Sequence, residues 1–337
     1  MGKRITVILF IALSLATAYL VLQLNGILGS ISRSMLHYAS YSAGTDYRIA
    51  FIYQNNNDGF WQSIKKGAGQ ASRGERVHVS FFETLHGQEL QLTDYLHLAM
   101  DAGYNGIIIQ GEDERITPLI QEASGNGIAA MMVASDLPDS GRIGYVGTNN
   151  YQAGYVAGKT LMRSLRRTHP SLAVLSPLSG IDMQMSVAES LKVLGFREAV
   201  SARETIIPLW EKSNPSLIDS IKIVRNMLAK YPHLEGVYAT YPEGALAVAR
   251  VIQENGLTNR IHVIGHGDLP EIREAIRQGV IEMSIIEYPY QMGYTAVKEM
   301  VRYLREGRVN IASNIDVITL NRNNLQQYKK EAAQWKQ

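Results

Sequence analysis

Some stretches of the sequence have residue types and spacings that perform chemistry in other proteins. Ala153–Thr160 (AGYVAGKT) satisfies a loose phosphate-loop pattern, in which backbone N–H groups hold a phosphate. Such a loop begins directly after a strand, whereas this stretch begins several residues after the strand-like run 142–147. Its Tyr, Val and Ala spacing is that of a helix, so we predict a helix with small residues at a close packing contact and no nucleotide site.

Patterns for metal binding and catalysis are missing. The eight histidines include no His-Glu-x-x-His, and the Asn-rich run 54–58 lacks the closing Glu of a calcium loop. The sequence has no Gly-x-Ser-x-Gly elbow, and no nucleophile–base pair or carboxylate pair stands out. We therefore predict no enzymatic activity, no metal and no cofactor.

Short apolar runs alternate with helical segments from residue 47 onward. Near-continuous apolar strands between helices are typical of a parallel sheet covered on both faces. The second half repeats the rhythm, which predicts an α/β protein with two doubly wound parallel-sheet lobes and ligands at the carboxyl ends of the strands. The expected strands are 48–53, 77–82, 106–110, 130–133, 172–175, 205–209, 236–240, 261–265 and 283–286.

Composition narrows the functional classes. The chain has 337 residues, 46% of them hydrophobic and 19% charged, with a net charge of +2 spread evenly along it. This composition excludes a disordered chain, and no basic stripe indicates nucleic acid as a partner. Cysteine is absent, which excludes disulfides, thiolate metal sites and lipid attachment at a cysteine.

The amino terminus has the pattern of an export signal or membrane anchor. Lys3 and Arg4 precede an uncharged, mostly apolar run from Ile5 to Leu24, about the length that spans a bilayer as a helix. The run continues past Ala16–Ala18, a small-x-small signal-peptidase pattern, and this favours an uncleaved anchor over a cleaved signal. We expect a transmembrane or signal helix over 1–25, a linker over 26–46, and the rest of the chain on the extracytoplasmic face of the membrane.

Five motifs in order resemble those of the type 1 periplasmic sugar-binding proteins. They are Asp58–Trp61 (family Asn-Pro-Phe-Phe), Tyr145–Gly154 (Gly-Thr-Asp-Asn and an Ala-Gly pair), Val237–Leu246 (Ala-Thr-Asn-Asp-x-x-Ala-Leu), Val263–Pro270 (Val-Gly-Phe-Asp-x-x-Pro) and Tyr288–Gly293 (Asp-Pro-Tyr-Gln-Met-Gly). The resemblance covers residues 47 to about 328. It implies a three-segment hinge, a first lobe of 47–149 plus 288–312 and a second lobe of 150–287 plus 313–330.

The resemblance also implies a sugar site between the lobes, with aromatic rings covering the apolar faces of the ligand. Phe60 and Trp61 stand where the family has two stacking aromatics, and Trp210 stands at a strand end where the family also has one. The alternative for each ring is an ordinary core position.

The polar half of the family's site is altered in this sequence. Ser135, with Asp136 beside it, stands at the family's Asp-Arg, and Tyr241 stands at its Asn-Asp. The remaining matches are Asp268 near the family's later Asp, Glu287 at its Gln, and Lys192 nearest its Arg, although Ser190 fits another alignment. We therefore expect a site rich in carboxylates (Asp58, Asp136, Asp268 and Glu287) that suits a modified, cationic or longer polar ligand.

Two roles follow from the resemblance, and both need a membrane partner. The chain either delivers a sugar to the permease of an ABC-type transporter or reports ligand-driven lobe closure to a sensor kinase. An uncleaved anchor favours sensing, and a cleaved signal favours transport. Repressors with this fold carry an amino-terminal helix-turn-helix where this chain has an apolar run, so nucleic acid is not an expected partner.

Overall fold

The computed structural model describes residues 47–55, 59–85, 91–111, 113–165, 170–178, 185–200, 205–211 and 216–328. The predicted anchor (1–25) and linker (26–46) lie outside these residues, so both stay predictions. Among the helices of the described residues, none is long and apolar enough to cross a membrane.

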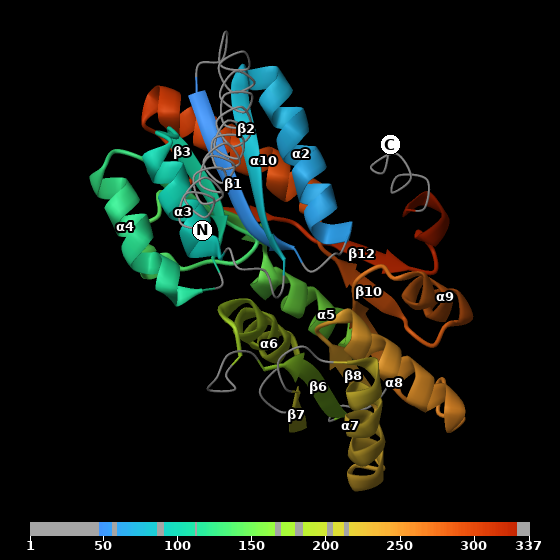
Figure 1. Cartoon of the computed structure of the whole chain (residues 1–337). Helices are drawn as coiled ribbons and strands as arrows, with labels where there is room; N and C mark the ends of the chain where they lie inside the picture. Colours follow the sequence, from blue (N-terminus) through green and yellow to red (C-terminus); the bar gives the residue numbers. More distant parts are fainter. Residues whose placement is uncertain are drawn as a thin grey trace, which may run out of the picture.

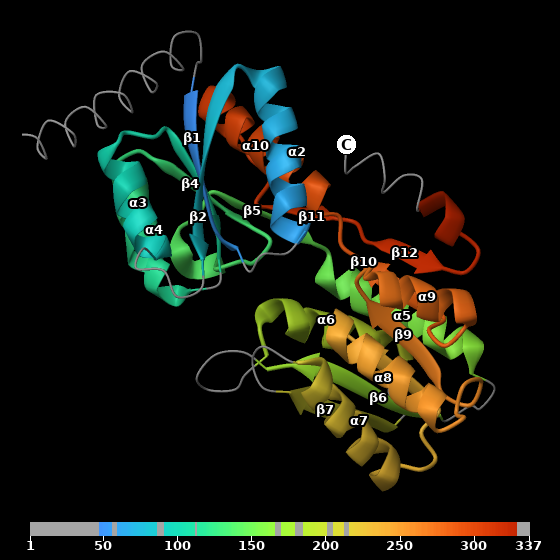
Figure 2. The ribbon, with the colours of Figure 1, turned by 45° about the vertical axis from the view of Figure 1, so that its right-hand side comes forward.

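The first lobe is a six-stranded sheet in the order β11-β5-β4-β3-β1-β2, flanked by helices (Figures 1 and 2). All its pairings are parallel, with Tyr47 of β1 opposite Val77 of β2. Its strands are β1 (Tyr47–Asn55), β2 (Val77–Leu85), β3 (Gly106–Gln110), β4 (Ala129–Val133), β5 (Gly144–Thr148) and β11 (Ala312–Ile315). Its helices are α2 (Gly59–Glu75), α3 (Leu92–Asp101), η1 (Glu114–Ile116), α4 (Thr117–Gly125), η2 (Pro138–Ser140) and α10 (Pro289–Glu306).

The second lobe repeats this plan with strand order β12-β10-β9-β8-β6-β7. Only β12, which is antiparallel to β10, breaks the parallel arrangement of this sheet. Its strands are β6 (Ser171–Pro177), β7 (Thr205–Glu211), β8 (Gly236–Ala239), β9 (His262–His266), β10 (Met283–Ile286) and β12 (Ile318–Asn321). Its helices are α5 (Asn150–Ser164), α6 (Val187–Val200), α7 (Leu217–Lys230), α8 (Pro242–Glu254) and α9 (Pro270–Gln278). The prediction of two doubly wound α/β units is confirmed.

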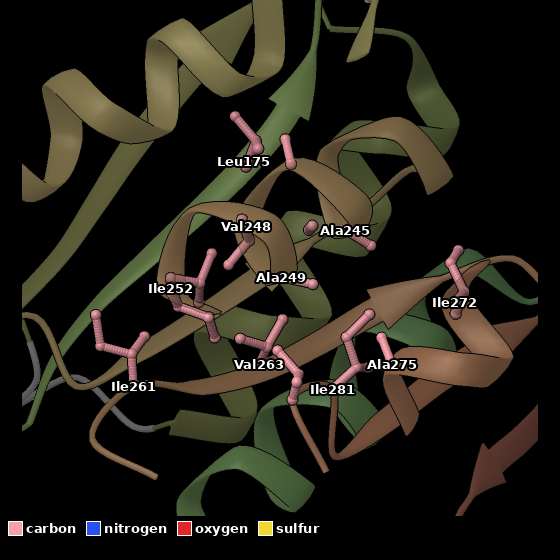
Figure 3. Packing of buried hydrophobic residues seen from close by; sticks show 14 of the residues in the cluster. Leu175, Ala245, Val248, Ala249, Ile252, Ile261, Val263, Ile272, Ala275 and Ile281 are labelled. Atoms are coloured by element: carbon pink, nitrogen blue, oxygen red, sulfur yellow. The ribbon is translucent and has the colours of Figure 1, made fainter. Parts of the chain in front are cut away.

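Both faces of each sheet are buried, as the apolar strands require. Along β1, Ile49 and Phe51 pack toward α2 and α10, while Ala50 and Ile52 pack toward α3 and α4. In the second lobe, Val248 of α8 and Val263 of β9 belong to one core that α7 and α9 share (Figure 3). The opposite face of that sheet is covered by α5 and α6. The two sheets therefore hold the carboxyl ends of their strands on rigid layers.

The chain passes between the sheets at three points: from β5 to α5, from β10 to α10, and from β11 to β12. The last of these passages differs from the predicted boundary after residue 312. That boundary falls inside β11, which pairs with β5 through Ala312 opposite Tyr145, so the chain leaves the first sheet only after Ile315. The predicted crossing is therefore corrected to 315–318, because strand pairing extends beyond the boundary that the motifs implied.

Residues 153–160, which satisfy the phosphate-loop pattern, lie within α5, so the predicted helix is confirmed. Gly154 lies against the backbone carbonyl of Lys192 on α6, and Gly195 of α6 lies against the carbonyl of Tyr151, leaving no room for a Cβ at either glycine. The glycines of this stretch therefore serve the contact between α5 and α6.

Gly158→Ala is expected to lower the free energy of unfolding by about 1–2 kcal/mol through overpacking. Its Cβ would lie 2.6 Å from Cβ of Ala199 and 2.9 Å from the carbonyl oxygen of Phe196. Gly69→Ala in α2 is the matched control, because its Cβ would meet nothing within 4 Å, and it should stabilise by about 0.5–1 kcal/mol. Urea denaturation of both variants tests this, and equal shifts would contradict the close packing of α5 on α6.

Candidate functional site

A group of polar side chains gathers at the carboxyl ends of the second sheet, next to the passages between the sheets. In a parallel sheet these ends meet along one edge, where ligands bind in open α/β proteins. Helix α6 adds two side chains from its first two turns and lies on the side of the second lobe that faces the first lobe (Figure 2). We call this group the strand-end cluster; it consists of Ser176, Glu189, Lys192, Thr240, His266 and Glu287.

A buried ion pair forms the centre of the strand-end cluster. Lys192 Nζ lies 2.8 Å from Glu189 Oε1 and 3.4 Å from the backbone oxygen of Thr240. The other carboxylate oxygen of Glu189 accepts hydrogen bonds from Ser176 Oγ at 2.7 Å and from the Thr240 hydroxyl. Both oxygens of this carboxylate are therefore satisfied, which is what a buried charge requires.

Glu287 joins this pair to the first lobe. It follows β10 directly, accepts a hydrogen bond from the side chain of Thr148 at the end of β5, and lies 3.9 Å from Lys192 Nζ. Its side chain is 29% exposed, compared with 7% for Lys192 and 11% for Glu189. Glu287 is therefore the acidic member of the cluster that solvent or a ligand can reach.

The burial of the cluster shifts the pKa values of its groups. Burial raises the pKa of Glu287 more than Lys192 lowers it, and nearby Glu189 adds to the rise. Burial alone would lower the pKa of Lys192, but the two glutamates reverse this and raise it. Burial, assisted by Lys192, holds the pKa of His266 well below its ordinary value. Near neutral pH, Lys192 is thus charged and His266 neutral.

The predicted aromatic contacts of the first lobe lie at the start of α2. Trp61 is 5% exposed and stacks on Tyr53, with ring centroids 4.8 Å apart, so one of its faces is covered by the core. Phe60 is half-buried and meets Trp61 edge-on at 5.6 Å. Phe60 therefore has the more accessible ring of the two. Asp58 lies outside the described residues.

Two of the predicted carboxylates are held by arginines. Asp136 receives hydrogen bonds from Arg142 at both oxygens, one of them 2.7 Å long. Asp268 Oδ2 lies 3.2 Å from Arg273 Nη1 and accepts a hydrogen bond of 2.8 Å from the hydroxyl of Tyr328. These partners occupy acceptor positions that the sequence left open, and a ligand contact by either carboxylate stays a prediction.

The other predicted residues have varied surroundings. Ser135 follows β4, and its backbone oxygen accepts a hydrogen bond of 3.2 Å from Gly111 N. Tyr241 is 7% exposed, belongs to the core of the second lobe, and has its hydroxyl 3.1 Å from Ser220 Oγ. It adds little aromatic surface for a ligand because its ring is buried. Trp210 lies in β7 opposite Ser176, and its side chain is outside the described part of the structure.

Sequence reasoning identified Lys192 and Glu287 but missed Ser176, Glu189, Thr240 and His266 in the cluster. The helical period held a usable signal for Glu189. It shares one buried face of α6 with Lys192, Phe196 and Val200, at the spacing of a core stripe. A Glu and a Lys inside such a stripe predict a buried ion pair.

Among the described residues, no group of three His, Asp or Glu side chains is arranged to hold a metal ion.

Comparison with known proteins gives one consistent family. Residues 49–308 match the periplasmic binding protein domain. Among curated relatives, the ribose import binding protein RbsB of Escherichia coli K12 is 19% identical over 269 residues, covering 80% of this chain and 88% of the relative. The D-allose-binding periplasmic protein of the same organism is 22% identical over 308 residues, covering 83% and 91%.

Solved structures agree with this match. GanP, a glucose-galactose binding protein from Geobacillus stearothermophilus, superposes with a TM-score of 0.70 at 26% identity, covering 83% of this chain and 98% of GanP. The XylFII-LytSN complex contains a chain that superposes with a TM-score of 0.67 at 25% identity, covering 82% of this chain and 98% of that one.

Proposed function

Because this chain belongs to the periplasmic binding protein domain family, we propose that it binds a sugar or a similar small polar ligand between its two lobes. We further propose that it does so on the extracytoplasmic side of the membrane and catalyses no reaction. The sugars in the names of its relatives, which include ribose, D-allose, glucose and galactose, support a carbohydrate ligand.

The observation that carries this proposal is the position of Glu287. It stands at the passage from β10 to α10, accepts a hydrogen bond from Thr148 of the first sheet and lies beside Lys192 of the second lobe. A ligand bonded there contacts groups from both lobes, and such contacts are what favours a closed arrangement. In this proposal Glu287 accepts hydrogen bonds from ligand hydroxyls, and Phe60 covers an apolar ligand face. Asp58, Ser135 and Trp210 stay predicted contacts.

A second candidate is a membrane-anchored sensor. It is favoured by the likeness to a chain of the XylFII-LytSN complex and by the predicted uncleaved anchor over residues 5–24. In this role the closure of the lobes on a ligand regulates a partner such as a sensor kinase. In the transport role the partner is the permease of an ABC-type transporter. Both roles start from the same ligand site.

A thermal-shift screen of the full-length chain against a carbohydrate panel tests the ligand class. A ligand at about 100 times its dissociation constant should add about 2.7 kcal/mol of stability and raise the melting temperature by a few degrees. Phe60→Ala should abolish the shift by removing the accessible aromatic surface.

Tyr231→Ala is the matched control for this screen. Tyr231 is also half-buried, but it ends α7 at the amino-terminal edge of the second sheet, away from the strand-end cluster. This variant should keep the ligand-induced shift. If no carbohydrate shifts the wild-type chain, the sugar-binding proposal fails, and capture of a membrane partner becomes the next experiment.

A further inference from the structure

Three carboxylates near the strand ends each have a direct cationic partner. Asp136 is paired with Arg142, and Asp268 with Arg273. In the strand-end cluster, the charge of Lys192 is matched by Glu189, to which it is directly bonded at 2.8 Å. Glu287 is the second carboxyl group of a cluster that holds one lysine.

Glu287 has no cation within hydrogen-bond distance in the part of the chain that the structure describes. Its nearest cation is Lys192 Nζ at 3.9 Å, which is held in place by Glu189 and by the backbone oxygen of Thr240. Its side chain is also more exposed than those of Glu189 and Lys192. Its pKa is raised because burial and Glu189 together outweigh the attraction of Lys192, so a further cation would stabilise its charged form.

We propose that this site, if it binds sugars as proposed above, prefers sugars that carry an ammonium group over their neutral counterparts and disfavours sugar acids. An ammonium group on the ligand gives Glu287 the direct, charge-assisted hydrogen bond that Lys192 does not supply. A neutral sugar gives the same carboxylate only a hydroxyl donor. A sugar acid places a second negative charge beside Glu287, while the one nearby cation is already paired.

Isothermal titration calorimetry of the full-length chain with matched ligands tests this inference. Each of glucose, galactose and mannose is compared with its 2-amino analogue, and glucose and galactose also with their uronic acids, at pH 6.5 and low ionic strength. The amino sugar of the preferred configuration should bind about tenfold more tightly than its neutral partner. The corresponding uronic acid should bind most weakly.

Two variants identify the carboxylate responsible. Glu287→Gln should reduce the ratio of amino-sugar to neutral-sugar affinity to about one, because the amide carries no charge. Glu254→Gln removes a carboxylate of α8 that forms an exposed pair with Arg225 of α7, and it should keep the wild-type ratio. Circular dichroism and a melting curve establish that each variant is folded. If a variant does not fold, the comparison of ligands on the wild-type chain still tests the ammonium preference.

The outcomes separate this inference from the proposed function. Binding of a neutral sugar as tightly as its amino analogue by the wild-type chain overturns the ammonium preference and leaves sugar binding in place. An unchanged ratio in Glu287→Gln also overturns the assignment to this carboxylate. Binding of none of the sugars overturns the proposed function, and the preference with it.

Discussion

Lys192→Met is expected to lower the free energy of unfolding by about 3–5 kcal/mol, measured by urea or guanidinium denaturation without ligand. The substitution removes the only ion-pair partner that the described structure gives to Glu189, leaving a buried carboxylate whose remaining partners are the hydroxyls of Ser176 and Thr240. The loss comes mainly from the uncompensated charge and not from the side chain that is removed.

Two further variants distinguish this cause from a general effect of substitution. Glu189→Gln combined with Lys192→Met should recover most of the loss, because replacing a whole buried pair by neutral groups is often close to neutral in stability. Lys222→Met breaks a pair of the same spacing with Asp219 on α7, where both side chains are more than half exposed, and should cost under about 0.5 kcal/mol. Equal losses in Lys192→Met and the double variant would contradict the charge explanation.

The wild-type chain is expected to lose stability at acidic pH because of His266, and His266→Phe should remove this loss. The folded pKa of His266 lies well below its ordinary value, whereas the unfolded imidazole titrates near about 6.5. Below that pH the unfolded chain binds a proton that the folded chain does not, so the free energy of unfolding falls by up to about 1.4 kcal/mol per pH unit. At pH 5 the variant should therefore be more stable than the wild type by up to about 2 kcal/mol, relative to their difference at pH 8.

Glu287 acts in the opposite direction, because its raised folded pKa makes the folded chain bind a proton more readily than the unfolded one. Both proteins contain Glu287, so its contribution cancels to first order when the free energy of unfolding of the wild type is subtracted from that of His266→Phe at the same pH. Denaturation curves at pH 5, 6, 7 and 8 measure that difference. A difference that did not change with pH would assign the effect to the packing of the new ring against Tyr238 and not to titration.

The sequence was sufficient to predict the layered α/β fold, because strands such as β3 and β4 are apolar along their whole length and are buried on both faces. Strands β11 and β12 were not predicted. Each has four residues, and β11 alternates exposed with half-buried positions at a sheet edge, a pattern that local sequence does not distinguish from a loop.

The site could be predicted in position but only partly in chemistry. The resemblance named Lys192 and Glu287, which the structure brings together near the passages between the sheets. It could not show that Asp268 is bonded to Tyr328, which lies 60 positions away in the sequence. Whether a carboxylate faces a ligand or an arginine depends on such distant contacts, and spacing within a motif does not report them.

The passage of the chain between the sheets also affects the order in which the lobes can be completed during synthesis. Helix α10 covers the face of the first sheet next to α2, yet its residues follow those of nearly the whole second lobe. A chain delivered from its amino terminus therefore leaves Ile64 and its neighbours uncovered until residues 289–306 arrive. β11 completes the first sheet still later, and β12 completes the second last. Neither lobe can therefore finish folding until nearly the whole chain has been made.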